Sequence, residues 1–163
     1  MRVELRAAKI PWIGQIAVHY WFVIHTQTRN DRWEIWQTAN LKPPCWGHLY
    51  QNLLPAYAGV GNGDSWMEQK WQEDTAIVLA KVIEASPDRY PYPHRYRYWP
   101  GPNSNTYVQW ILDQAQIPHL LSHRGLGKGY GKWLSRQDRP SAPIAPHDNL
   151  TVRYIFNNPE FLE

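Results

Sequence analysis

The segment WPGPNSNTYVQW, residues 99–110, has the residue types that acyl-transfer chemistry needs. Two prolines and a glycine turn the chain sharply before the apolar spacing of a helix begins, so Ser104 is predicted at or beside a helix N-terminus. The first free N–H groups of a helix stabilise negative charge, which suits a nucleophile or an oxyanion. Asn and Ser are also preferred helix caps, so capping by Asn103 or Ser104 is the structural alternative.

A serine nucleophile needs a general base, because a helix dipole alone cannot ionise a hydroxyl group. His19 is the candidate base, since it lies in the middle of the apolar segment at residues 16–26. An imidazole in such surroundings must be hydrogen-bonded or bear a desolvation cost, and a catalytic pair with Ser104 would satisfy it. A hydrogen-bonded core histidine without catalytic function is the alternative.

Other nucleophile, metal and phosphate sites are weaker in this sequence. Cys45 and His48 lie close together in a proline-rich segment, but their spacing matches no nucleophile motif. The histidines and the single cysteine lack the spacing of a metal site, so we predict neither a metal nor another cofactor. The stretch GLGKGYG, residues 125–131, lacks the order of a phosphate-binding loop and is predicted to be flexible.

The stretch RYPYPHRYRYWPGP, residues 89–102, interleaves basic and aromatic side chains. Such surfaces stack single-stranded bases, but no nucleic-acid-binding signature accompanies this one, so a nucleic-acid partner is not predicted. We expect alternate aromatics to enter the core and the arginines to face solvent. If the aromatics are exposed, a protein partner is the alternative, because Trp, Tyr and Arg dominate interface hot spots. The candidate binding residues are Arg95, Tyr96, Arg97, Trp99, Asn103 and Asn105.

Charge and composition limit the classes of protein that remain. Residues 89–139 carry eight basic and two acidic side chains, an excess that favours an anionic ligand, with a solvated basic face as the alternative. The single cysteine excludes an internal disulfide, and the apolar runs are too short to span a bilayer. The N-terminal sequence MRVELRAAKI is too charged for a signal peptide, so we expect a cytoplasmic protein without a transmembrane segment.

The elements that must position these residues suggest an α+β fold. Alternating apolar residues predict strands at 3–10, 16–26 and 33–38, while helical spacing predicts helices at 68–85 and 104–116. A short helix is expected at 48–53 and a last strand at 150–156. We therefore predict a single domain over residues 1–163, with an antiparallel sheet of three to five strands packed on two main helices. Loose segments are expected at about 40–63 and 125–149.

The segments IAVHYWFVI, YPYPHRYRYWPGPNSNTY and GLGKGY resemble a bacterial family of unknown function, DUF3750. The resemblance runs over most of residues 8–131. The family name implies no established activity.

A more distant resemblance is to permuted papain-like folds of the NlpC/P60 and lecithin–retinol acyltransferase types. Those folds place a histidine on an early strand and, later, an asparagine–cysteine pair at a helix N-terminus. His19 and Asn103-Ser104 follow the same order, with Ser104 in the place of the cysteine. The resemblance implies either a hydrolase or acyltransferase with a serine nucleophile, or an inactive relative. It also implies a polar group on the next strand that orients the imidazole, for which Glu34 and Gln37 are the candidates.

Overall fold

The structure, a computed structural model, describes residues 1–11, 14–42 and 44–132. The described residues up to Gly131 form one compact unit. The predicted strand at 150–156 and most of the predicted loose segment at 125–149 lie outside the described residues. A single domain over residues 1–163 therefore stays a prediction.

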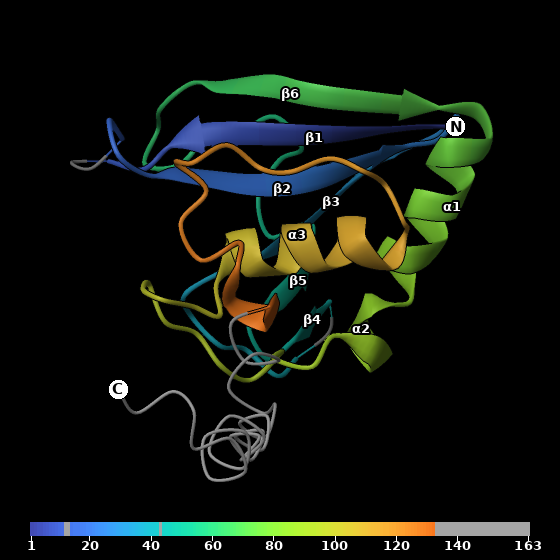
Figure 1. Ribbon diagram of the computed structural model, residues 1–163. Coiled ribbons are helices and arrows are strands. Elements are labelled where there is room, and N and C mark those ends of the chain that lie inside the picture. The colour runs from blue at the N-terminus through green and yellow to red at the C-terminus, as the bar shows by residue number, and fades with distance from the viewer. Residues whose placement is uncertain (12–13, 43, 133–163) are drawn as a thin grey trace, which may run out of the picture. The chain divides into compact units, whose positions relative to one another are not determined.

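An antiparallel sheet of six strands forms the centre of the described chain (Figure 1). Its spatial order is β4-β5-β3-β2-β1-β6, so β2 lies inside the sheet and β6 pairs with the outer edge of β1. This central place explains why every residue of β2 is buried. The strands are β1 (Arg2–Lys9), β2 (Val18–His25), β3 (Asn30–Ile35), β4 (Cys45–Trp46), β5 (Leu49–Gln51) and β6 (Ser65–Gln72).

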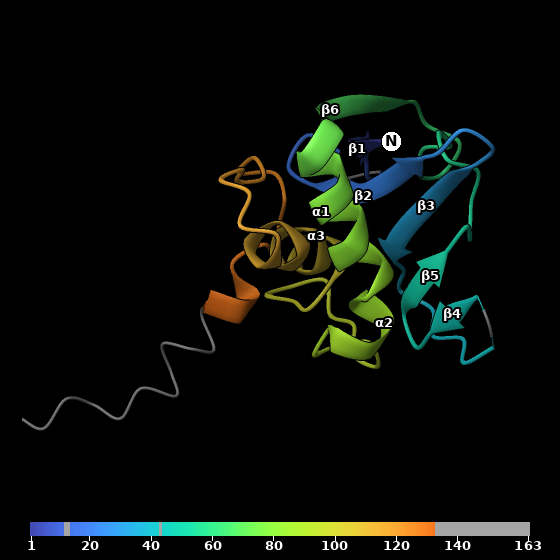
Figure 2. The same ribbon diagram turned by 90° about the vertical axis from the view of Figure 1, so that its right-hand side faces the viewer.

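Two helices, α1 (Glu73–Glu84) and α3 (Ser104–Gln114), cover one face of the sheet (Figure 2). Their buried side chains join alternate residues of β1, β2 and β3 in the main hydrophobic core. A short helix, α2 (Ser86–Arg89), follows α1. The predicted α+β class is confirmed, although the sheet has six strands rather than three to five. In the described part of the chain, no helix is both long and apolar enough to cross a membrane.

The opposite face of the sheet carries buried polar and charged side chains beneath residues 52–64, which connect β5 to β6. Ala56 and Val60 of this loop pack against a small apolar cluster that includes Trp21 of β2. The indole N–H of Trp21 donates to the carbonyl of Ala56 at 3.0 Å. Around this cluster the sheet buries Glu4, His19, His25, Arg32 and Glu34.

Two segments predicted to be helical are strands in the structure. The helix expected from residue 68 begins only at Glu73, because residues 65–72 form β6. Pairing with the outer edge of β1 satisfies the backbone of this segment, and Trp66 and Trp71 still pack against the core. The short helix expected at 48–53 is replaced by β5, which pairs with β3.

Candidate functional site

His19 and Glu34 form a buried pair on the face of the sheet beneath the 52–64 loop. The Nε2 atom of His19 lies 2.9 Å from Oε2 of Glu34, and neither residue is more than 5% exposed. Strands β2 and β3 bring them together. Because Phe22 pairs with Trp33 on one face of the sheet, the side chains of His19 and Glu34 both point to the other face. Of the two predicted orienting residues, Glu34 is therefore the one that contacts the imidazole.

Arg32 holds the Glu34 carboxylate from its other side. Its Nη2 donates to Oε2 of Glu34 at 2.8 Å, and its Nε lies 2.8 Å from Oε1 as an ion-pair contact. The guanidinium is fully buried, donates to the carbonyls of Pro55 and Ala58, and lies 4.1 Å from the ring centre of Trp21. The arginine therefore compensates the carboxylate charge within the fold.

These contacts decide the ionisation of Glu34. Burial alone raises the pKa of this carboxyl group. The hydrogen bonds and charges of His19 and Arg32 lower the pKa, and together they outweigh the effect of burial. The pKa of Glu34 lies below its ordinary value of 4.5 as a result. A carboxylate that is ionised at neutral pH is suited to accept the Nε2–H of His19, which leaves Nδ1 as the basic atom of the ring.

The N-terminus of α3 is capped by Asn103 rather than by Ser104. The side-chain oxygen of Asn103 accepts from the backbone N–H groups of Asn105 and Thr106 at 3.0 and 3.2 Å. The Thr106 hydroxyl in turn accepts from the N–H of Asn103 at 3.1 Å, which completes a capping box. Gly127 has a φ of +87° and passes so close to Asn103 that a β-carbon would clash with it.

Ser104 is the first residue of α3, and its hydroxyl is not used for capping. Its Oγ donates to Oδ1 of Asn105 at 3.4 Å, which is a long hydrogen bond. Within residues 1–11, 14–42 and 44–132, the backbone N–H of Ser104 has no hydrogen-bond partner. Ser104 is 4% exposed, so its N–H group and its weakly bonded hydroxyl both lie beneath the surface at the start of α3.

Asn105 ties the N-terminus of α3 to strand β2 on either side of His19. Its Oδ1 accepts from the N–H of Tyr20 at 3.2 Å, and its Nδ2 donates to the carbonyl of Val18 at 2.9 Å. The pairing of β2 with β3 stops at Phe22. The Asn105 amide therefore bonds to a part of β2 that is not paired with β3. This is a positioning role that sequence spacing did not reveal.

Among the described residues, Ser104 and His19 have no direct hydrogen bond, and Asn105 is the residue that connects them. Through Asn105, the Ser104 hydroxyl is connected by contacts of 3.4 and 3.2 Å to the backbone N–H that follows His19. The imidazole itself is directed to Glu34 and to the ring of Trp36, whose centre is 5.2 Å away. Among the described residues, the hydrogen bonds of the two side chains do not join them.

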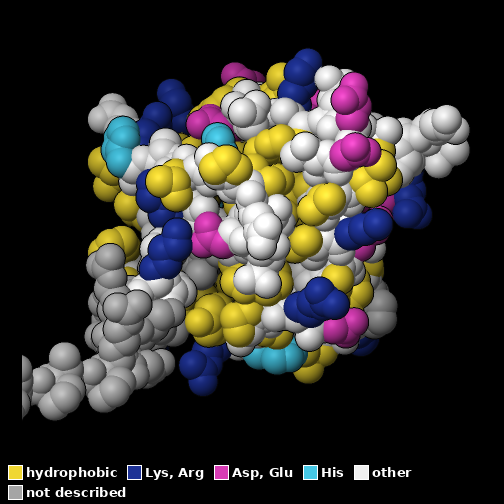
Figure 3. Space-filling view, turned by 45° about the vertical axis from the view of Figure 1, so that its right-hand side comes forward, with side chains coloured by type: hydrophobic (Ala, Val, Ile, Leu, Met, Phe, Trp, Pro, Cys, Tyr) yellow, Lys and Arg dark blue, Asp and Glu magenta, His cyan; other side chains and the backbone are white. Residues whose placement is uncertain are grey.

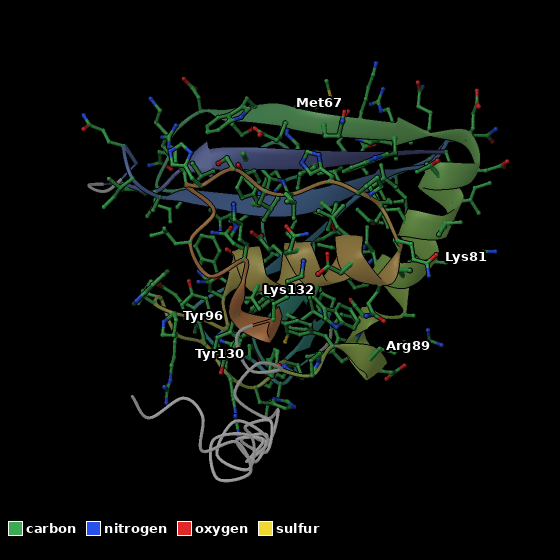
Figure 4. The ribbon with its side chains drawn as sticks, in the orientation of Figure 1. Met67, Lys81, Arg89, Tyr96, Tyr130 and Lys132 are labelled. Carbon is green, nitrogen blue, oxygen red and sulfur yellow. The ribbon has the colours of Figure 1, made fainter. Side chains whose placement is uncertain are left out.

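His19 faces a cavity of about 310 Å³. Tyr98 and Gln37 line it together, and the Tyr98 hydroxyl donates to Oε1 of Gln37. Tyr96 lies toward the end of the molecule at which α3 begins (Figure 4), and burial raises the pKa of its hydroxyl to about 12. The described lining residues are Ile10, Pro11, His19, Trp36, Gln37, Val60, Tyr96 and Tyr98.

The remaining predicted binding residues are mostly at the surface. Arg95 and Arg97 are exposed and Tyr96 is half-buried, as the alternating pattern predicts. Tyr98 and Trp99 depart from that pattern, because 67% and 70% of their surfaces are exposed. Basic and acidic side chains are interspersed on the face shown in Figure 3, which includes α1.

The weaker nucleophile and metal candidates are not assembled into sites. The Cys45 thiol contacts the carbonyls of Asn40 and Lys42, whereas the His48 ring bonds to the carbonyl of Trp36 at 2.9 Å. Where the structure describes the chain, His, Cys, Asp and Glu side chains do not gather in threes that could hold a metal ion.

Comparison with known protein families identifies a family for this chain. A family model described as "Protein of unknown function (DUF3750)" matches residues 1–130. No curated protein and no solved structure matches the chain.

Proposed function

Since the chain belongs to the DUF3750 family, whose description names no activity, we propose a function from its site: the protein is a hydrolase or acyltransferase that forms an acyl-enzyme. Ser104 is the nucleophile, His19 is the general base and Glu34 orients the imidazole. The observation that carries this proposal is the bonding of Asn105 to β2 on both sides of His19. It ties a helix N-terminus, where the Ser104 hydroxyl makes one long hydrogen bond, to the strand that carries a carboxylate-bound imidazole.

In the proposed reaction, the Ser104 hydroxyl leaves Asn105 and donates to Nδ1 of His19. Its oxygen attacks the acyl carbon while His19 takes the proton, and the Ser104 N–H stabilises the oxyanion. His19 then protonates the leaving group, whose bond to the acyl carbon breaks. Water, or a second alcohol or amine, releases the acyl group by the same steps in reverse. Such catalytic hydrogen bonds are often formed only when substrate is bound.

The order of these residues along the chain is part of the same proposal. His19 on an early strand followed by Asn103-Ser104 at a helix N-terminus matches the order in permuted papain-like folds. Here Ser104 would take the place of the usual cysteine. Since a serine hydroxyl is a weaker nucleophile than a thiol, it depends on His19 more strongly than a cysteine would.

Labelling with a fluorophosphonate tests the proposal, because this probe reacts with hydroxyl groups that a neighbouring base activates. We expect wild-type protein to gain one adduct at Ser104, as read by intact mass and peptide mapping. Ser104→Ala and His19→Gln should remove the adduct, and Ser122→Ala is the matched control. Ser122 also lies near β2, where its hydroxyl bonds to Tyr20 at 3.0 Å. An adduct that persists in Ser104→Ala, or wild-type protein that stays unlabelled, would contradict the proposal.

A thiol at this position gives a second readout. In Ser104→Cys, the helix N-terminus and His19 should lower the thiol pKa below about 8.5, so the protein should react with iodoacetamide near neutral pH. A reaction no faster than that of free cysteine, in a protein with unchanged circular dichroism, argues against the proposed site.

Protein binding is a second candidate function, favoured by the exposure of Tyr98 and Trp99 beside Arg95 and Arg97. Exposed aromatic and arginine side chains are typical of interface hot spots. Native mass spectrometry of the complex purified from cells tests this candidate. A partner that dissociates on Trp99→Ala supports it, whereas a strictly monomeric protein with no partner contradicts it.

A further inference from the structure

The cavity beside His19 differs from the surrounding surface in having hardly any charge. His19 is the one histidine among the described residues that line it, and no Asp, Glu, Lys or Arg appears among them. Burial of a charged ligand group without a partner is costly, so the lining disfavours an acyl group that carries its own charge. The nearby Arg95 and Arg97 are exposed and do not contribute to the wall.

Half of the described residues that line the cavity carry aromatic rings. The rings of Tyr96 and Tyr98 meet edge to face at 5.3 Å, and those of His19 and Trp36 at 5.2 Å. Aromatic rings favour such perpendicular contacts with a further ring, because a ring edge is attracted to a ring face. A planar ring therefore matches this cavity better than a flexible chain.

The volume of the cavity suits a small ligand group. About 310 Å³ is at the lower end of the range for small-molecule sites, which is about 300–1,000 Å³. Tyr98 and Gln37 both line the cavity and are joined by a hydrogen bond, and 67% of the Tyr98 surface is exposed. A single ring matches this volume, whereas a long acyl chain would extend beyond the cavity.

We infer that the acyl group transferred at this site is compact, uncharged and ring-bearing, of the benzoyl type, and that Tyr98 and Gln37 determine this specificity. The inference rests on the proposed function, since it names the substrate class of the same site. It adds a prediction that labelling of Ser104 does not make, because a reactive serine can serve acyl groups of any size.

The substrate test compares three ethyl esters that share one leaving group: ethyl benzoate, ethyl octanoate and monoethyl succinate. We expect kcat/KM to be at least about tenfold higher for the benzoate than for either competitor, a difference of about 1.4 kcal/mol. Tyr98→Ala should remove the preference over octanoate, and Tyr98→Phe, which lacks only the hydroxyl, should reduce it. Leu120→Ala is the control, since Leu120 is 70% exposed and does not line the cavity.

A binding measurement separates this inference from the proposed chemistry. Ser104→Ala protein is titrated with benzamide, octanamide and succinamate, and binding is followed by ligand-observed NMR. Preferential binding of benzamide, lost in Tyr98→Ala, supports the inference. If Ser104 resists labelling in the same protein, only the proposed chemistry is contradicted. Labelling of Ser104 combined with equal binding of the three amides, or tighter binding of octanamide, overturns the inference alone.

Discussion

Strand β2 buries both of its faces, but the two faces differ in chemistry. Toward the helices it presents Val18, Tyr20, Phe22 and Ile24 to the main apolar core. Toward the 52–64 loop it presents His19, Trp21, Val23 and His25, which lie among buried charges on β1 and β3. The helix face is stabilised by apolar burial, whereas the loop face depends on each charge having a partner. Complete burial therefore does not mean that the two faces serve the same purpose.

The largest expected effect tests the apolar face. Phe22 is fully buried between the sheet and the helices, so Phe22→Ala should lower the free energy of unfolding by about 3–5 kcal/mol. Urea denaturation with an unchanged m-value measures it. Phe22→Leu, which leaves a smaller cavity, should cost less. Equal losses for the two variants would mean that this face does not depend on close packing.

Glu34→Gln tests the charged face, with an expected effect nearly as large. Removing the carboxylate charge leaves Arg32 buried without a compensating anion, which costs about 3–5 kcal/mol when a buried ion pair is broken. Glu84→Gln, at an exposed position of α1, should change stability little. A loss for Glu34→Gln no greater than for this control would show that the pair contributes nothing to folding.

The same pair predicts how stability depends on pH. The pKa of Glu34 is lowered in the folded protein, so its contribution is fully present above about 4.5, the value in the unfolded chain. This contribution to stability is lost as pH falls through the lower pKa of the folded state. The reason is that Glu34 binds a proton more tightly in the unfolded chain than in the folded protein. Comparing urea midpoints of wild type and Glu34→Gln between pH 6 and pH 3 should show a smaller acid loss in the variant. Parallel profiles would contradict the lowered pKa of Glu34.

Asn105 joins the two layers, and its replacement should have an intermediate effect. Asn105→Ala leaves the N–H of Tyr20 and the carbonyls of Val18 and Leu126 without this partner, which should cost about 1–3 kcal/mol. Asn105→Asp keeps the acceptor but loses the amide donor, so the loss of the two carbonyl contacts can be measured separately. Labelling of Ser104 should fall in both variants even where they remain folded. Unchanged labelling would show that Asn105 does not position Ser104.

The smallest effect distinguishes the two neighbours at the start of α3. Asn103→Ala should cost about 0.5–2 kcal/mol, because it removes the cap of the helix. Ser104→Ala should cost clearly less, since the Ser104 hydroxyl makes only one long hydrogen bond among the described residues. Thermal unfolding of the two variants decides this order. A larger loss of stability for Ser104→Ala than for Asn103→Ala would show that Ser104 caps the helix.

Periodicity was sufficient to predict β2 and α3, because each has a continuous run of apolar residues at its own repeat. It failed for β6, where apolar residues at 66, 67 and 71 fit neither repeat well and pairing with the edge of β1 decided the structure. The alternation in β3 also contained a signal that was missed. Arg32 and Glu34 lie on the same side of a buried strand, where charged residues need partners.

The candidate site was partly predictable for a similar reason. A histidine in an apolar strand implies a polar partner, and the choice between Glu34 and Gln37 depended only on register. The role of Asn105 could not be predicted, because it depends on where β3 separates from β2. Nor could sequence show that Tyr98 and Gln37, 61 residues apart, line one cavity.

The Asn105 link also makes one backbone amide a reporter of docking between distant parts of the chain. The Tyr20 N–H is bonded to a side chain 85 residues away instead of to a neighbouring strand, so its protection from hydrogen exchange requires α3 to be in place. Contacts at such sequence separation form late, after the chain between them has lost its freedom. Exchange at Tyr20 relative to Phe22, which lies within the paired part of β2, would therefore report how often α3 undocks while the sheet stays intact.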